Sequence, residues 1–218
     1  MLDHAQGGLV LKPGPSRASG FTLIELMITI ALLALLMMLA VPAFNRWISD
    51  AKVRAAAESL QNALRQAQST AIARNRATVF VLTSATPALN ATPSANASNW
   101  YAQVLPLSGS DESSTAAANY VQGSNIATQN GVTITGPALV CFCALGKQLT
   151  SAASATGNLS TACTAPSDDA GTPSTSYTLS RTSAQRTLKV LVYLGGRVRM
   201  CDAAKTLSND NPDGCPSS

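Results

Sequence analysis

Residues 21–43 read FTLIELMITIALLALLMMLAVPA, an apolar run that contains a single charged residue, Glu25. An α-helix needs about 20 apolar residues to cross the hydrocarbon core of a bilayer. The apolar part of a cleaved secretory signal is usually only about 7–15 residues long. The run therefore predicts a membrane-spanning helix over residues 21–43 rather than an ordinary signal peptide.

Glu25 does not fit an ordinary uncleaved anchor, which is the alternative interpretation. An ionised carboxylate inside a span costs about 2.5–3.5 kcal/mol on insertion scales and is rarely found without a partner. Glu25 lies only a few residues from the start of the apolar run. A free amino terminus at Phe21 would supply a cation at a similar depth. We therefore predict cleavage between Gly20 and Phe21, with residues 1–20 as a leader.

The residues around this bond, GFTLIE at positions 20–25, resemble the prepilin motif of the type IV pilin-like superfamily. The resemblance implies that a prepilin peptidase cleaves after Gly20 and methylates the new amino terminus at Phe21. It also implies that Glu25 pairs with the terminal amine of a neighbouring subunit during assembly. The expected partners are the peptidase, other pilins or pseudopilins, and the inner membrane.

Pro42 fits the same resemblance, because it is the twenty-second residue counted from Phe21 and pilins carry a helix-breaking residue at about that place. A proline inside a helix removes a backbone donor and kinks the helix. The flanking charges give no clear orientation by the positive-inside rule: they are Lys12, Arg17, Arg46, Lys52 and Arg54. The resemblance implies a cytoplasmic leader and a periplasmic domain, which enters a pilus or pseudopilus after assembly.

An amphipathic helix is predicted over residues 44–76. Apolar residues recur there at spacings of three and four, which places them on one helix face: Val53, Ala57, Leu60, Leu64, Ala67 and Ala71. If unbroken from Thr22 to Arg76, the helix is about 80 Å long at 1.5 Å per residue. Its apolar stripe must be buried against another element.

Residues 77–218 read as a β-rich domain. Strands are predicted at 78–84, 100–105, 132–135, 138–143, 177–181, 187–194 and 197–201, and polar loops at 85–99, 109–119 and 150–175. A helix followed by antiparallel strands is an α+β arrangement. It resembles the GspH/FimT branch of the superfamily, which implies a long helix packed on an antiparallel β-sandwich-like domain.

A hairpin is predicted at Gly195-Gly196, where both glycines can adopt φ > 0 in a tight turn. Side chains alternate in a strand, so Arg197 and Arg199 share one face. Two guanidinium groups about 7 Å apart match the spacing of successive phosphates along a nucleic-acid strand. An ordinary solvated strand face or a subunit contact is the alternative.

The residues Gly196-Arg197-Val198-Arg199 resemble the Gly-Arg-x-Arg motif of FimT-type minor pilins, which is associated with DNA binding for uptake. The resemblance implies that Arg197 and Arg199 contact phosphates. Lys205 extends this predicted patch, as Lys189 and Arg186 do with less support. The carboxylates of Asp202, Asp210 and Asp213 dilute its positive charge.

The cysteines Cys141, Cys143, Cys163, Cys201 and Cys215 all lie late in the chain, which indicates disulfides formed in an oxidising compartment. We predict a Cys201–Cys215 bond, worth about 3 kcal/mol of unfolded-state entropy for a loop of this length. We also predict a Cys143–Cys163 bond, although the pairing stays open. A zinc site is the alternative, but Cys-x-Cys without histidine matches it poorly.

Enzyme chemistry is not expected. The only histidine, His4, lies in the predicted leader, so the mature chain has no imidazole base and no histidine ligand for a metal. No nucleophile–base pair or phosphate loop is present, so we predict no cofactor and no metal. The formal net charge of +4 is too small to indicate a nucleic-acid binder by itself. The sequence favours a minor type IV pilin, with a GspH-like pseudopilin of a type II secretion system as the alternative.

Overall fold

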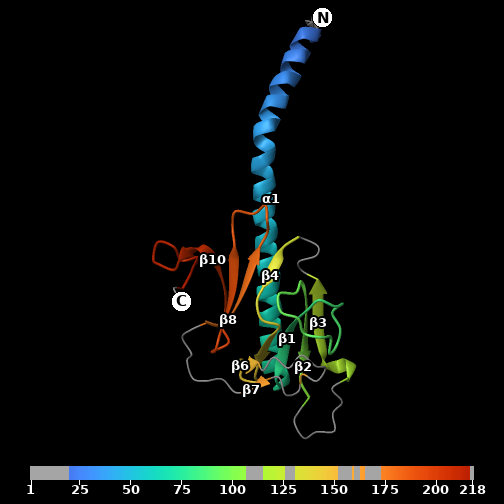
Figure 1. Cartoon of the computed structure of the whole chain (residues 1–218), viewed down its shortest axis with the longest axis vertical. Helices are drawn as coiled ribbons and strands as arrows, with labels where there is room; N and C mark the ends of the chain where they lie inside the picture. The colour runs from blue at the N-terminus through green and yellow to red at the C-terminus, as the bar shows by residue number, and fades with distance from the viewer. Residues whose placement is uncertain are drawn as a thin grey trace, which may run out of the picture. The chain divides into compact units, whose positions relative to one another are not determined.

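The computed structural model describes residues 20–106, 115–125, 131–151, 159, 163–164 and 173–216. The chain forms two compact units, Met1–Pro42 and Ala43–Ser218. One helix, α1 (Leu23–Arg74), runs from the first unit into the second (Figure 1). The helix ends two residues before the predicted position, at a Schellman-type cap. Asn75 adopts φ 50° there, and Arg76 donates its N–H to the carbonyl oxygen of Ala71 at 3.0 Å.

In the first unit, the described residues are the beginning of α1 and the three residues before it. Every described side chain from position 20 to 42 is exposed, including the large apolar ones such as Leu23 at 81% and Leu39 at 72%. Among the described residues, α1 is the helix that is long and apolar enough to cross a membrane. Burial of this apolar surface therefore requires lipid or other protein chains.

The second unit contains two sheets, as far as the structure describes it. The first has the strand order β3-β2-β1-β5-β6-β7 and the second the order β11-β10-β9-β8-β4. Neighbouring strands are antiparallel except for β10 and β11, which are parallel. The strands are β1 Thr78–Thr83, β2 Asn99–Val104, β3 Tyr120–Asn125, β4 Thr133–Thr135, β5 Leu139–Phe142, β6 Gln148–Ser151, β7 Cys163–Thr164, β8 Pro173–Ser180, β9 Leu188–Tyr193, β10 Val198–Thr206 and β11 Gly214–Cys215.

The main core lies between the second half of α1 and both sheets. The predicted stripe residues Val53, Ala57, Leu60, Leu64, Ala67 and Ala71 are all fully buried, and Ala56 and Ala63 join them. Side chains of both sheets complete this core, among them Phe80 of β1, Phe142 of β5 and Val190 of β9. The predicted α+β fold, a long helix packed on antiparallel strands, is confirmed.

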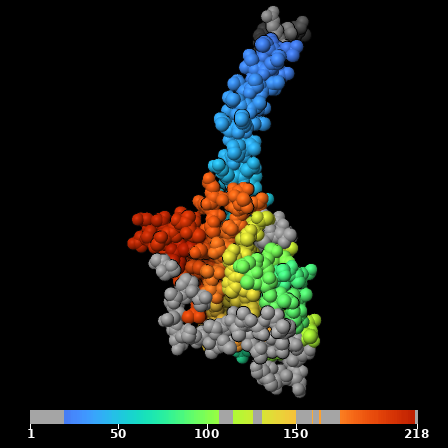
Figure 2. All heavy atoms as spheres, viewed as in Figure 1, coloured from blue at the N-terminus to red at the C-terminus, as the bar shows by residue number. Residues whose placement is uncertain are grey.

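A second apolar cluster lies on the opposite face of β1 from the main core. It includes Val79 and Val81 of β1, Tyr101 of β2 and Cys141 of β5. A third, smaller cluster joins Leu191 and Tyr193 of β9 to Cys201 of β10. Because side chains alternate along a strand, β9 and β10 direct one set of residues to the main core and the other set to this third cluster. The C-terminal segment, shown in red in Figure 2, lies on the surface of the second unit.

The predicted strands are present with shifted ends. β8 begins at Pro173, inside the loop predicted over 150–175, and β10 continues to Thr206. Four strands, β3, β6, β7 and β11, were not predicted. Two of them have only two residues each, and β3 reads YVQGSN, which lacks an apolar alternation. Pairing with neighbouring strands, rather than local apolar pattern, gives these segments their structure.

Candidate functional site

The predicted cleavage bond lies directly ahead of α1. Gly20 has no neighbouring atom within 4 Å of where a Cβ would stand, and Phe21 is 84% exposed. Thr22 then caps the helix: its Oγ1 accepts a hydrogen bond from the N–H of Glu25 at 3.3 Å. Its carbonyl oxygen accepts another from Leu26 at 3.1 Å. The bond between Gly20 and Phe21 therefore lies in exposed, non-helical chain.

The capping role of Thr22 was not predicted from the sequence. A threonine followed three residues later by glutamate is the sequence signature of a capping box. Of the two bonds of a capping box, only the one to Thr22 Oγ1 is present among the described residues, because the Glu25 side chain accepts no hydrogen bond there. The negative Glu25 side chain in the first turn also interacts favourably with the positive end of the helix dipole.

The carboxylate of Glu25 has no hydrogen bond or ion pair with any residue that the structure describes. It is surrounded in sequence by exposed apolar side chains, from Leu23 to Leu26 and beyond. Pro42, the predicted helix-breaking residue, lies inside α1 at the boundary between the two compact units. α1 continues to Arg74, so the proline does not end the helix.

The second candidate site is the β9–β10 hairpin. The N–H of Tyr193 donates to the carbonyl oxygen of Arg197 at 2.9 Å, and the N–H of Gly196 donates to that of Tyr193 at 2.7 Å. These bonds close a three-residue loop, 194–196, in which the third residue adopts φ +87°. The hairpin turn is present where it was predicted, but only Gly196 of the two glycines has positive φ, because this loop type needs a left-handed residue only there.

Gly196 is also required by a close approach. A Cβ at this position would collide with the carbonyl oxygen of Gly146 and with the side-chain amide of Gln68. Gln68 donates to that same carbonyl oxygen at 2.8 Å. Gly196 therefore holds the hairpin against α1 and the turn after β5. The structure therefore gives Gly196 a role in packing, not a direct contact with a ligand.

Arg197 is the exposed cation of the hairpin. It precedes β10 by one residue, and its guanidinium lies 4.2 Å from the ring centroid of Tyr193. A cation over an aromatic face is attracted by the ring quadrupole, and the ring orients it. The tyrosine is only 4% exposed, so its ring is held by packing and keeps the guanidinium of Arg197 in one position.

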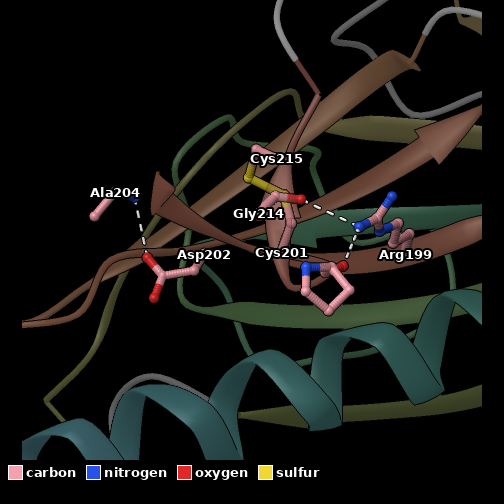
Figure 3. The surroundings of a disulfide bond; sticks show 7 residues. Arg199, Cys201, Asp202, Ala204, Gly214 and Cys215 are labelled. Atoms are coloured by element: carbon pink, nitrogen blue, oxygen red, sulfur yellow. Dashed lines mark hydrogen bonds between the residues drawn. A yellow bond between two sulfur atoms is a disulfide. The ribbon is translucent and has the colours of Figure 1, made fainter. Parts of the chain in front are cut away.

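Arg199 has a different environment. It is half-buried, and its Nη2 donates to the carbonyl oxygens of Pro212 at 2.7 Å and Gly214 at 3.1 Å (Figure 3). It shares a strand face with Arg197, since Val198 and Met200 face the main core. The predicted alternation is thus present, but the guanidinium of Arg199 is engaged with the C-terminal loop.

Lys205 is paired as well. Its Nζ lies 2.6 Å from Oδ2 of Asp213, and this hydrogen bond holds the pKa of the Asp213 carboxyl below its ordinary value. Lys189 is half-buried opposite Cys201. Arg186 precedes β9 and lies at the other end of the hairpin, about 17 Å or more from the turn at 3.3 Å per residue. Lys205 and Arg186 therefore do not join Arg197 in one patch.

Two disulfides are present. Cys201 and Cys215, the predicted pair, are bonded with their Cα atoms 5.0 Å apart. The predicted Cys143–Cys163 bond is wrong: Cys163 pairs with Cys141, at a Cα distance of 5.8 Å, and Cys143 is a free thiol.

The register of the strands explains why Cys141, and not Cys143, is bonded to Cys163. Cys141 lies in β5 opposite Leu149 of β6, and β6 in turn pairs with β7 at Cys163. Cys143 follows the end of β5 and takes part in a turn, where its N–H donates to the carbonyl oxygen of Lys147 at 2.9 Å. Among the described residues, no group of three or more His, Cys, Asp or Glu side chains is placed to hold a metal ion.

Comparison with known protein families gives a sequence match at the N-terminal segment. Residues 15–41 match the family model described as the prokaryotic N-terminal methylation motif. The matched range contains the predicted cleavage bond, the capping pair Thr22 and Glu25, and most of the apolar run. No match was found among the curated proteins. The match covers the N-terminal segment and leaves the second unit unassigned.

Two crystal structures of the type IV minor pilin FimU from Pseudomonas aeruginosa (strain PAO1) are similar to the chain. The one in space group P65 has 15% sequence identity and a TM-score of 0.42, and covers 70% of this chain and 94% of that chain. The one in space group P21 has 14% identity and a TM-score of 0.44, with 70% and 90% covered. Identity and TM-score are both too low to carry a functional assignment.

Proposed function

We propose that the chain is a minor subunit of a type IV pilus. It is made as a precursor, cleaved between Gly20 and Phe21 by a prepilin peptidase, and methylated at Phe21. The observation that carries this proposal is the methylation-motif match over residues 15–41, and the apolar helix that begins at Leu23, within the matched range, supports it. In the precursor the helix anchors the chain in the inner membrane, with the second unit in the periplasm.

The assembly part of the proposal is supported by Glu25, whose carboxylate has no ion-pair partner within the part of the chain that the structure describes. A charge in an apolar segment is stabilised by a partner of opposite charge. Cleavage creates an ammonium group at Phe21, and the same group on a neighbouring pilin is a partner of the required charge and depth. We expect Glu25→Gln to leave cleavage intact and to lower incorporation into filaments.

The test is the amino terminus of the protein isolated from its host. Mass spectrometry is expected to find N-methylated Phe21 as the first residue, and Gly20→Val is expected to leave the leader attached. An intact leader on the wild-type protein in filaments would refute the proposal. A pseudopilin of a type II secretion system would be processed in the same way, so recovery from sheared surface pili, rather than from the periplasm, distinguishes the two.

A second proposed function is DNA binding by the β9–β10 hairpin, for which Arg197 is the specific observation. This arginine is exposed at the turn, and its guanidinium is oriented by the ring of Tyr193. We assign the direct phosphate contact to Arg197. Arg199 and Lys205 instead bind the C-terminal loop, at Pro212 and Asp213. Gly196 supplies the loop conformation.

Fluorescence anisotropy with a labelled DNA duplex and the full chain in nonionic detergent tests this function. Arg197→Ala is expected to weaken binding and to reduce the slope of log K against log salt by about 1. Arg46→Ala is the matched control, because it removes an exposed arginine of α1 that lies 22 helical positions from Gln68, about 33 Å at 1.5 Å per residue. Absence of binding by the wild-type chain at low salt would leave the subunit role alone.

A further inference from the structure

A pocket of about 460 Å³ lies within the second unit, between α1, the start of β9, the first half of β10 and the C-terminal loop. Its lining combines charged and apolar side chains. Trp47, Asp50 and Arg54 of α1 recur at spacings of three and four, so they form one stripe of the helix. The strands add Leu188, Met200 and Asp202. None of the functions proposed above uses this pocket.

Asp202 gives the pocket its charge. The residue is only 5% exposed, and its Oδ1 accepts a hydrogen bond from the N–H of Ala204 at 3.0 Å. Figure 3 shows the second carboxylate oxygen pointing away from Ala204. Within the described residues, no ion pair involves this carboxylate. A buried charge is stabilised when it is paired and hydrogen-bonded, so Asp202 is suited to receive a cation.

The other charges of the pocket are mostly engaged. Arg54 is paired with Glu58 at 2.8 Å, and Asp213 is paired with Lys205 at 2.6 Å. Asp50 accepts hydrogen bonds from backbone N–H groups. Among the described residues, Asp50 and Asp202 have no ion pair, and the remaining cation of the lining is Arg186, whose charge acts on Asp213. The pocket therefore has an excess of one negative charge.

The apolar part of the lining lies beside this charge. Leu188 is 8% exposed, and the half-buried Met200 packs against the main core. Trp47 is 69% exposed and presents an aromatic ring. An amphipathic cation suits this combination: its methylene stem packs on apolar side chains, its charged end pairs with a carboxylate, and an aromatic face adds to the attraction.

We propose that this pocket binds a lysine or arginine side chain of a neighbouring protein subunit. The stem lies against Leu188 and Met200, and the cationic end pairs with Asp202. That this side chain comes from a neighbouring subunit rests on the proposed filament function. The chemistry of the pocket does not rest on it, because that chemistry follows from the residues of one chain.

Binding is tested with the full chain in a nonionic detergent and with Nα-acetyl-arginine amide and Nα-acetyl-lysine amide as probes. The chain contains two tryptophans, Trp47 and Trp100, and the second is 3% exposed in the main core. Each gives its own indole N–H signal in a ¹H–¹⁵N spectrum. At least one probe is expected to shift the Trp47 signal in a saturable manner while the Trp100 signal stays in place.

Two variants and a matched control test whether the charge of Asp202 causes the binding of the basic probes. Asp202→Asn keeps the acceptor for Ala204 and removes the charge, and it is expected to weaken binding by about tenfold. Asp210→Asn removes an exposed carboxylate outside the pocket and is expected to leave binding unchanged. Arg186→Gln removes the opposing cation and is expected to strengthen binding several-fold, so a poorly folded Asp202 variant does not prevent the test.

The proposal is overturned if neither basic probe shifts Trp47, or if the neutral analogue Nα-acetyl-citrulline amide binds as tightly as the arginine probe. Equal binding by the Asp202→Asn and wild-type chains would also overturn it. These measurements use a single chain and a soluble probe. Their failure is therefore separate from a failure of cleavage at Phe21, which would remove the filament function but not the pocket.

Discussion

The carboxylate of Asp50 in α1 accepts a hydrogen bond from the backbone N–H of Gln185, 2.8 Å away, across 135 positions of sequence. The N–H of Arg186 donates to the same oxygen at 3.1 Å. The side chain thereby satisfies two donors of the turn between β8 and β9. It fixes the start of β9 against the helix.

Asp50→Ala is expected to lower the stability of the second unit by about 1 kcal/mol, because two backbone donors lose a charged acceptor at a partly exposed site. Thermal unfolding of the full chain, followed by near-ultraviolet circular dichroism, measures the change. Asp50→Asn keeps one acceptor oxygen and is expected to lose less. Equal midpoints for all three proteins would contradict this role.

Thr22→Ala is expected to destabilise the first turn of α1 by about 1 kcal/mol, the usual value for loss of an N-cap side chain. Amide hydrogen exchange at Glu25, whose N–H donates to Thr22 Oγ1, reports the loss directly. Thr22→Ser retains the hydroxyl and serves as the control. Unchanged exchange at Glu25 in the alanine variant would show that the hydroxyl does not cap the helix.

Gly196→Ala is expected to destabilise the hairpin by more than 1 kcal/mol. The residue has φ +87°, and the added methyl group meets the carbonyl oxygen of Gly146. Its neighbour is a matched control, because Gly195 has open space around it and its φ is not positive. Gly195→Ala is therefore expected to unfold at nearly the wild-type denaturant concentration.

Replacing both Cys201 and Cys215 by serine is expected to cost about 3 kcal/mol, the value for a closed loop of this length. Cys143→Ser is the control, since this thiol forms no disulfide. Peptide mapping under non-reducing conditions is expected to recover Cys141 linked to Cys163. A recovered Cys143–Cys163 peptide would contradict the register of β5, β6 and β7.

The Lys205–Asp213 contact is expected to weaken in acid. The hydrogen bond from Lys205 lowers the pKa of the Asp213 carboxyl, so the contact contributes above the ordinary carboxyl pKa and is lost as pH falls through the lowered one. Nuclear magnetic resonance titration of the Asp213 carboxyl measures this directly. Lys205→Gln is expected to raise the pKa toward its ordinary value, and no rise would contradict the assignment.

The helix was predictable because its signal is local and periodic. The apolar residues from Val53 to Ala71 define one face of the helix, and every predicted member of that face is buried in the structure. The longer β-strands were predictable for a similar reason. β3 and β11 were not, because Gln122, Gly123 and Gly214 belong to no apolar pattern and acquire strand geometry from their neighbours.

The candidate sites show the same limit. Sequence places Arg197 and Arg199 on one face, but it does not reveal that the second guanidinium contacts Pro212 and Gly214. Nor does it reveal that Lys205 pairs with Asp213. These partners belong to a loop whose path depends on the disulfide and on β11. Contacts of this kind are set by tertiary structure, and a residue pattern carries no information about them.

Five of the buried positions on α1 are alanines: Ala56, Ala57, Ala63, Ala67 and Ala71. Because alanine side chains are only methyl groups, the two sheets contact the backbone of the helix over much of this surface. Substitution is therefore tolerated unequally on the two sides of the core. Valine, leucine and isoleucine can be exchanged in the strands with modest repacking, whereas a larger residue on the helix face forces the sheets outward. Attempts to stabilise this domain by filling its core should begin with the strands.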